Sequence, residues 1–176
     1  MSKKPETMDV TEVAEVVPAS TLFDRVGEFL DHMEWRYTSS ENRDAYFFTI
    51  RLRAGSVRVM ADVYEAPEWQ RIAVLTTFHI FVPEHRRNAI AEALIRINYT
   101  LTMGGFDMDM RDGEVRVRTV LETDGVLGDA LIDRAVRRGL DLADQYQAPL
   151  LAIAFGNASP ADVIEMASHS GDAVLQ

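Results

Sequence analysis

The densest group of side chains that could do chemistry is an acidic stretch between residues 107 and 114. Asp107, Asp109, Asp112 and Glu114 surround Gly113, an arrangement that invites comparison with a calcium-binding loop. An EF-hand loop needs oxygen ligands at positions 1, 3 and 5, glycine at position 6 and glutamate at position 12. Counted from Asp107, positions 5 and 12 are both arginine, so the spacing argues against a metal site.

The same stretch is better explained as a β-hairpin, because Asp112-Gly113 is a strong signal for a two-residue turn. Counting outward from this turn predicts four facing pairs: Met110–Val115 and Met108–Val117 toward the core, and Asp109–Arg116 and Asp107–Arg118 toward solvent. Facing side chains of opposite charge stabilise a sheet by roughly 0.2–1 kcal/mol per pair. These carboxylates are therefore predicted to be partners of arginine rather than metal ligands.

The sequence contains no other recognisable catalytic or cofactor-binding pattern. Cysteine is absent, and Lys3 and Lys4 are the only lysines, which removes thiolate, disulfide, Schiff-base and P-loop chemistry from the folded region. No serine lies in a G-x-S-x-G elbow, and Gly104-Gly105 stands between a predicted helix and a predicted strand, the reverse of a dinucleotide-binding turn. We therefore expect no catalytic residue, no cofactor, no metal and no enzymatic activity.

The histidines are isolated from one another along the chain: His32, His79, His85 and His169. No two of them have the close spacing that zinc sites use, and no HExxH pattern exists. His79 lies on a predicted strand with Thr77 and Phe81 on its own side. We interpret it as a packed or interface side chain rather than as a ligand or a general base.

One predicted surface has the composition of a protein interface, in which aromatic, methionine and arginine side chains are enriched. It is the outer face of the first hairpin, and its candidate binding residues are Phe47, Arg51, Arg53, Arg58, Met60 and Tyr64. A two-residue turn would place Arg53 opposite Arg58, a repulsion that an acidic partner would relieve. The alternative is that a helix or a loop of the same chain covers this face.

Length and composition set further bounds on the function. A chain of 176 residues suits one domain with one core. The formal net charge of −10 would repel a phosphate backbone, so we expect no nucleic-acid partner. No run approaches the roughly 20 apolar residues that cross a bilayer, and the first residues do not resemble a signal peptide. We expect a cytoplasmic protein without a membrane partner.

Periodicity predicts one helix and three strands in the first half of the chain. The helix starts at Thr21, with Asp24 three residues later as in a capping box. The strands are predicted at about residues 46–53, 57–64 and 71–81. The third strand is apolar on both parities, which predicts that helices or a second subunit cover both of its faces.

The second half is predicted to add a helix, the hairpin and a long helix. The first of these helices starts at Pro83 and ends near Met103, and Asn98 beside its apolar stripe needs partners from loop backbone. The long helix starts near residue 127 and is interrupted by Pro149. A short helix with Ser159 as its cap is possible at residues 160–167. The resulting fold class is α+β, an antiparallel sheet with helices in the order α-β-β-β-α-β-β-α.

Three segments carry a family resemblance: Leu94-Ile95-Arg96-Ile97-Asn98-Tyr99, Gly105-Phe106-Asp107-Met108-Asp109 and Asp112-Gly113-Glu114-Val115-Arg116. They resemble the YbjN family, bacterial proteins labelled sensory transduction regulators, over about residues 21–155. The resemblance implies a fold like that of type III secretion chaperones, which are small, acidic and usually homodimeric, and which hold a partner polypeptide without ATP. The sequence pI of about 4.8 agrees with that class.

These observations predict three regions: a mobile acidic tail (1–19), a YbjN-like α+β domain (20–155) and a C-terminal extension with a possible short helix (156–176). We expect a homodimeric, non-enzymatic module that binds another polypeptide, chaperone-like or regulatory, with stress signalling as its possible context. Two alternatives stay open. One is a sensor that holds a small molecule between sheet and helices. The other is an enzyme of unfamiliar type that uses Asp, Glu, His or Arg.

Overall fold

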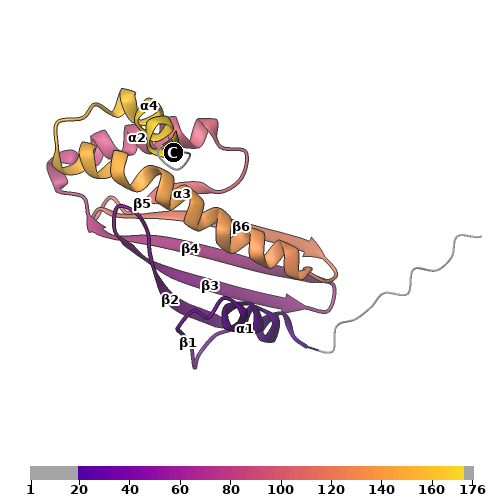
Figure 1. Ribbon diagram of the computed structural model, residues 1–176. Coiled ribbons are helices and arrows are strands. Elements are labelled where there is room, and N and C mark those ends of the chain that lie inside the picture. Colours follow the sequence, from indigo (N-terminus) through magenta and orange to yellow (C-terminus); the bar gives the residue numbers. More distant parts are fainter. Residues whose placement is uncertain (1–19, 173–176) are drawn as a thin grey trace, which may run out of the picture.

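The computed structural model describes residues 20–172 and has a single antiparallel sheet at its centre (Figure 1). The strands lie side by side in the order β1-β2-β3-β4-β6-β5. Their bounds are β1 Tyr37–Ser39, β2 Ala45–Arg51, β3 Ser56–Ala66, β4 Trp69–Phe81, β5 Gly105–Met108 and β6 Glu114–Asp124. The predicted α+β class is confirmed, while the predicted tail at residues 1–19 and the last residues, 173–176, lie outside the described part of the chain.

Four α-helices and two short 3₁₀ turns complete the part of the chain that the structure describes. They are α1 Leu22–His32, η1 Glu84–Arg86, α2 Arg87–Thr100, α3 Asp129–Phe155, η2 Pro160–Asp162 and α4 Val163–Asp172. The predicted capping box is confirmed, because the Thr21 side chain accepts a hydrogen bond from the backbone of Asp24 and the Asp24 side chain accepts one from the backbone of Thr21. None of the described helices combines the length and the apolar character that a membrane span requires.

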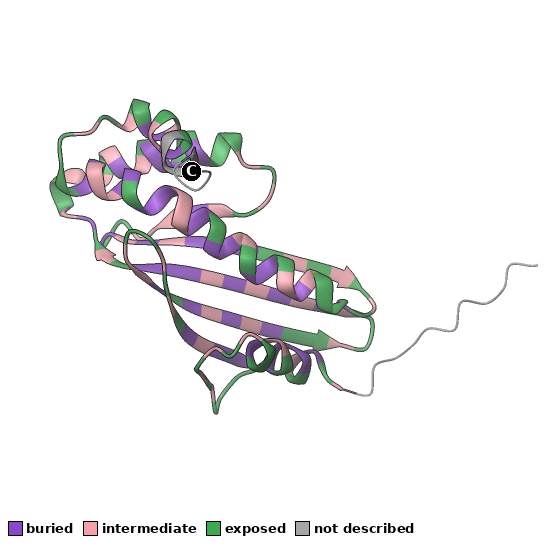
Figure 2. Ribbon diagram, viewed as in Figure 1, coloured by how far each residue is buried: buried purple, intermediate pink, exposed green. Residues whose placement is uncertain are grey.

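The core lies between the sheet and the helices that pack on one of its faces, here called the inner face. Side chains of alternate strand residues are buried there, which Figure 2 shows as purple bands across the strands. Val57, Val59, Ile72 and Val74 are fully buried on this face. The two-residue periodicity of the sequence predicted that Phe47, Arg58 and Met60 lie on the outer side of the first hairpin, and the register with Val57 and Val59 on the inner face confirms this.

Three elements differ from the sequence expectations. The strand β1 was not predicted, since it has three residues and is held by its pairing with β2. Helix α3 continues through Pro149 because Pro149, Leu150 and Ile153 are all buried, and this packing compensates for the missing backbone donor. Helix α2 ends at Thr100, before the predicted end, while the predicted cap of the last helix is confirmed by the bond from Ala161 N to Ser159 Oγ.

The register of the β5–β6 hairpin differs by two residues from the prediction. Met108 faces Val115 and Asp107 faces Arg116. The hairpin closes farther from its tip, because Asp109 N donates to Glu114 O at 2.9 Å and Gly113 N donates to Asp109 O at 2.8 Å. Gly113 has φ 85° and its carbonyl accepts from Val82 N at 2.9 Å, so a contact with the β4–α2 connection fixes the longer turn. A shift of two residues keeps the paired side chains on their predicted faces. Met110, which was predicted to face the core, lies in the turn instead and is 49% exposed.

Candidate protein-binding face

The face of the sheet opposite the helices, here called the outer face, has no helical cover among the described residues (Figure 1). Helices α1 and α3 contact β3, β4 and β6 from the inner side. The alternative that a helix of this chain covers the first hairpin is therefore wrong for residues 20–172. Helices of the described chain do not cover the outer side of β4 either, where Leu75 is only partly buried. The alternative cover of that side by a second subunit stays a prediction.

The strand register arranges outer-face side chains in rows that cross the sheet. Phe47 faces Met60, Met60 faces Leu75, and Leu75 faces Arg118. The neighbouring row consists of Thr49, Arg58, Thr77 and Arg116. One row is thus apolar over three strands and the next is polar, so the outer face presents an apolar strip beside charged groups.

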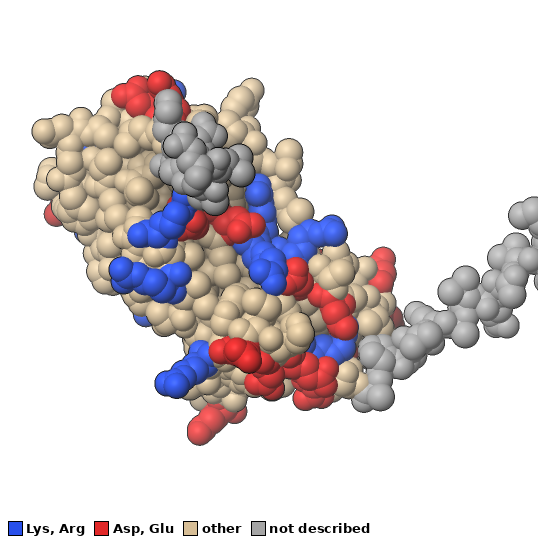
Figure 3. Space-filling view, viewed as in Figure 1, with Lys and Arg blue, Asp and Glu red and all other residues tan. Residues whose placement is uncertain are grey.

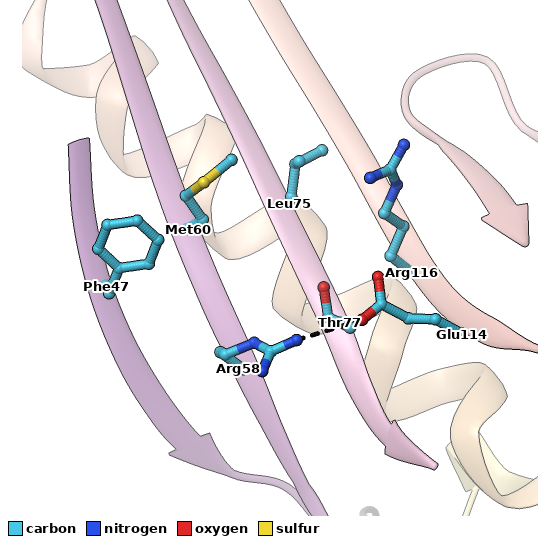
Figure 4. Close-up of a pocket in the computed structure, with 7 residues that line it drawn as sticks. All are labelled: Phe47, Arg58, Met60, Leu75, Thr77, Glu114 and Arg116. Atoms are coloured by element: carbon cyan, nitrogen blue, oxygen red, sulfur yellow. Dashed lines mark hydrogen bonds and ion pairs between the residues drawn. The ribbon is translucent and has the colours of Figure 1, made fainter. Parts of the chain in front are cut away.

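A hollow of about 440 Å³ lies over these two rows near the middle of the outer face (Figure 4). Its lining residues are Phe47, Arg58, Met60, Leu75, Thr77, Glu114 and Arg116. Arg58 Nη2 lies 3.2 Å from Glu114 Oε2, and this ion pair spans the sheet from β3 to β6 above Thr77 of β4. The hollow therefore offers an apolar wall and two guanidinium groups with one carboxylate between them.

Aromatic rings and arginines are combined at both ends of this face. At one end the Arg43 guanidinium lies 5.6 Å from the centre of the Phe47 ring. At the other end Tyr64 and Trp69 stack with their ring centres 4.5 Å apart, and Arg71 lies over both rings. Such side chains supply large contact areas and are enriched at protein interfaces.

The structure brings together some of the candidate residues predicted from the sequence. Phe47, Arg58 and Met60 line the hollow. Tyr64 is 46% exposed and belongs to the second aromatic group, and Arg51 is exposed at the end of β2. The contributions of β4 and β6 to this face were not predicted, because the order of the strands in the sheet had not been derived. The alternation along β4 could have indicated them, since it places Trp69, Arg71, Ala73 and Leu75 on one face.

Arg53 has a different environment from the other candidates. It lies in the β2–β3 turn, where its Nε donates to Asp144 Oδ2 of α3 at 2.6 Å. The expected opposition of Arg53 and Arg58 is wrong, because Arg58 faces Thr49 and the turn closes through Leu52 N and Gly55 O. The strand β2 ends at Arg51 rather than at the predicted residue 53, so Arg53 lies in the turn and its side chain contacts α3.

The acidic stretch forms ion pairs with arginines, and of the two predicted charge pairs Asp107 with Arg118 is present while Asp109 with Arg116 is not. Asp107 lies 2.9 Å from Arg118 Nε and 3.5 Å from Arg116 Nε. Asp109 instead binds Arg111, and the hydrogen bonds from the Arg111 side chain and backbone lower the pKa of Asp109 to about 2. Within residues 20–172 no group of three or more His, Asp or Glu side chains is placed to hold a metal ion.

His79 is exposed, so it is not packed in the core of this chain, and its interpretation as an interface side chain stays a prediction. It follows a position where the pairing of β4 and β6 shifts between Thr77 and Phe81. Such an irregularity re-aims strand side chains, and Phe81 is 61% exposed. Among the described residues, the side-chain hydrogen bonds do not join His79 to a possible catalytic partner.

Helix α2 carries a second exposed apolar group on the side away from the core. Ile95 is 70% exposed and Tyr99 is 93% exposed, one helical turn apart. Asn98, on the same helix, holds β5 through two bonds with Phe106, from Phe106 N to Oδ1 at 2.8 Å and from Nδ2 to Phe106 O at 3.0 Å. The predicted backbone partners of Asn98 are thereby confirmed.

The charged side chains on the helical side of the molecule form no surface of a single sign in the space-filling view. In the space-filling view of that side, acidic and basic side chains are interspersed (Figure 3). Examples are the pair Asp133–Arg137 within α3 and the pair Arg53–Asp144. An interface with a large field of one sign is not visible from this direction.

A comparison with protein-family models matches residues 22–152 to YbjN, described as "Putative bacterial sensory transduction regulator". The matched range runs from the start of α1 almost to the end of α3 and includes all six strands. A search among curated proteins found no match. The match covers well over half of the 176 residues, so the chain belongs to the YbjN family.

Proposed function

We propose that this protein is a non-enzymatic regulatory module that binds a partner polypeptide with the outer face of its sheet. The observation that supports the proposal best is the hollow lined by Phe47, Met60 and Leu75, which lies on a face without helices. The description of the family as a regulator of sensory transduction agrees with a module that acts by binding.

The lining of the hollow indicates the chemistry of the partner. Its apolar wall fits one apolar anchor side chain. Arg58 and Arg116 are ion-paired with Glu114 and Asp107, respectively, so an acidic side chain of the partner would bind beside the anchor by competing for these exposed arginines. The protein has a net charge of −10, so these arginines act at short range within an otherwise repulsive field.

Affinity capture with matched variants tests the proposal. The bait is the full-length chain, and the readout is the amount of each captured polypeptide, measured by mass spectrometry. Phe47→Ala with Met60→Ala should reduce one specific partner at least about tenfold, because interface anchors contribute about 2 kcal/mol or more. Phe155→Ala, at an exposed apolar residue outside both the outer face and the α2 surface, is the control and should retain that partner. Equal capture by both variants would reject the outer face.

We also propose that the protein is a homodimer and that α2 forms the contact. Ile95 and Tyr99 are the most exposed large apolar residues of the described chain and lie one helical turn apart, and adjoining exposed apolar groups mark interaction sites more than scattered single ones do. Light scattering at micromolar concentration should give twice the chain mass of 19.8 kDa, and Tyr99→Ala with Ile95→Ala should give one. A wild-type mass equal to that of one chain would refute dimerisation and would leave the outer-face proposal unaffected.

A cytoplasmic location and a role in stress signalling belong to the same proposal and rest on the sequence and the family. Fractionation of native cells tests the location, and growth of a deletion strain under defined stresses tests the role. The alternative sensor, with a small molecule between sheet and helices, is not favoured by the described residues. The inner-face side chains are buried against α1 and α3, and the hollow lies on the other side.

A further inference from the structure

The cross-strand rows of the outer face continue beyond the hollow toward the turn between β3 and β4. Leu75 marks the apolar row of the hollow, and Thr77 marks the row of Arg58 and Arg116 on one side of it (Figure 4). The next row on the other side has Ala73 on β4, and this side chain is small. The outer face therefore extends along β4 past the hollow without a large side chain in the middle of that row.

Two carboxylates and two aromatic rings lie at the end of this face near the β3–β4 turn. Tyr64, Arg71 and Glu122 form one row across β3, β4 and β6. Trp69 faces Asp124 in the next row. The Arg71 guanidinium lies 5.5 Å from the centre of the Tyr64 ring and 5.7 Å from that of Trp69. Among residues 20–172 neither Glu122 nor Asp124 has an ion pair, and both are exposed, so this end presents two carboxylates that a cation could bind.

The opposite end of the face carries an excess of positive charge. Arg51 is exposed at the end of β2, and no acidic side chain in the described part of the chain forms an ion pair with it. Arg58 lies 3.2 Å from Glu114, and Arg116 shares the carboxylate of Asp107 with a second arginine. The arginines of this end therefore outnumber the carboxylates that they contact.

The spacing of the two charged ends from the hollow matches alternate residues of an extended chain. Each strand residue advances about 3.3 Å, so the row of Thr77 lies roughly 7 Å from that of Leu75, and the row of Arg71 lies roughly 13 Å away on the other side. An extended segment along β4 covers these distances in two and four residues. Because both numbers are even, the three side chains point to the same side of that segment. One acidic, one apolar and one basic side chain can therefore contact the face together.

We propose that the partner of the outer face binds along β4 as an extended segment with a defined order of charges. An acidic residue lies two positions from an apolar anchor, and a basic residue lies four positions from that anchor on its other side. The acidic side chain binds Arg58 and Arg116, and the anchor enters the hollow. The basic side chain binds Glu122 and Asp124.

The inference rests on the proposed function, because it specifies the kind of polypeptide that the same face binds. Complementary charges across an interface fix the register of the partner, and exchanged charges are repelled at both ends. The face therefore discriminates between partners that share the same anchor but differ in the order of their charges.

Two synthetic peptides of equal composition test the charge order by NMR titration of the full-length protein. The matched peptide has aspartate two residues before leucine and lysine four residues after it, with serine and threonine elsewhere. The exchanged peptide has the aspartate and the lysine in each other's place. The matched peptide should shift the amide signals of Leu75 and Glu122 and bind about three- to tenfold more tightly at low salt, because exposed ion pairs contribute modestly. Salt at roughly 1 M should remove this preference, since it screens such pairs.

Removal of the carboxylates gives the matched comparison. Glu122→Gln with Asp124→Asn should lower the preference for the matched peptide at least about twofold. Glu28→Gln with Glu34→Gln removes two exposed carboxylates outside this face and should leave the preference unchanged. The amide spectrum of each variant reports whether its fold is intact.

Three results would overturn the inference. Equal binding of the two peptides, with shifts at Leu75, would reject the charge order and leave the outer face as a binding site. An unchanged preference in the variant without Glu122 and Asp124 would assign the selection to another surface. The absence of shifts at Leu75 with either peptide would reject the extended segment, whereas the proposed function itself is decided by the capture experiment with Phe47→Ala and Met60→Ala.

Discussion

Arg58 of β3 and Glu114 of β6 form an ion pair across the intervening strand β4, with 3.2 Å between Nη2 and Oε2. The pair connects strands that are not neighbours in the sheet, and it crosses the floor of the outer-face hollow above Thr77. Its side chains are 55% and 28% exposed, so solvent screens the interaction. We therefore expect the ion pair to orient Arg58 toward a partner and to contribute little to the stability of the fold.

Removal of this pair should have little effect on folding. A double-mutant cycle with Arg58→Ala and Glu114→Ala is expected to give a coupling energy below about 1 kcal/mol in urea unfolding. The same variants should weaken partner capture, because Arg58 loses its position or its charge. A coupling energy of several kcal/mol would instead show that the ion pair stabilises the fold.

The Asp109 carboxyl should titrate well below its usual range. Its pKa is lowered from 3.8 to about 2 by the hydrogen bonds from Arg111. Because the folded-state pKa is the lower one, the stabilising contribution is present above about pH 4 and disappears as the pH falls toward 2. The carboxyl carbon shift in NMR measures the midpoint directly.

Arg111→Ala should move the Asp109 midpoint upward toward 3.8, whereas Arg118→Ala should leave it nearly in place. A titration midpoint of Asp109 near 4 in the wild type would show that Arg111 does not lower the pKa of this carboxyl group in solution.

Gly113→Ala should destabilise the protein by roughly 2–4 kcal/mol in chemical unfolding. The glycine has φ 85°, and an added Cβ would lie 2.3 Å from Val82 O. Gly128→Ala is the matched control, because a Cβ there meets nothing within 4 Å. The control should change the unfolding free energy by less than about 1 kcal/mol. Similar losses in both variants would contradict the account of the turn.

Asn98→Ala should cost about 1–3 kcal/mol, since it removes both bonds that hold Phe106 and leaves a backbone donor and acceptor without partners. Arg96→Ala on the same helix removes only the exposed pair with Glu92 and should cost less than about 0.5 kcal/mol. Thermal and urea unfolding measure both changes. A harmless Asn98→Ala would mean that β5 is held by other contacts.

The sequence was sufficient for features that depend on near neighbours. Thr21 with Asp24, the alternation of Val57 and Val59, and the partnership of Asn98 with loop backbone could all be predicted from local spacing. Each follows from capping chemistry or from the two-residue period of a strand.

Features set by distant contacts could not be predicted in the same way. The β5–β6 turn depends on the bond between Val82 and Gly113, and the helix through Pro149 depends on burial of Leu150. Four of the seven residues that line the hollow, Leu75, Thr77, Glu114 and Arg116, lie on β4 and β6, and their proximity to Phe47 requires the strand order β2-β3-β4-β6. The two-residue periodicity of a strand predicts which of its side chains share a face, but it does not predict which strands lie beside it.

Site-specific photo-crosslinking in native cells tests the central claim most directly. A photoreactive amino acid replaces Leu75 in the floor of the hollow or, as the control, Ile95 on α2. The account predicts a defined adduct with another polypeptide from position 75, lost when Arg58→Glu is added, and no adduct with that polypeptide from position 95. The absence of any adduct at position 75, or an adduct only with a second copy of this chain, would contradict it.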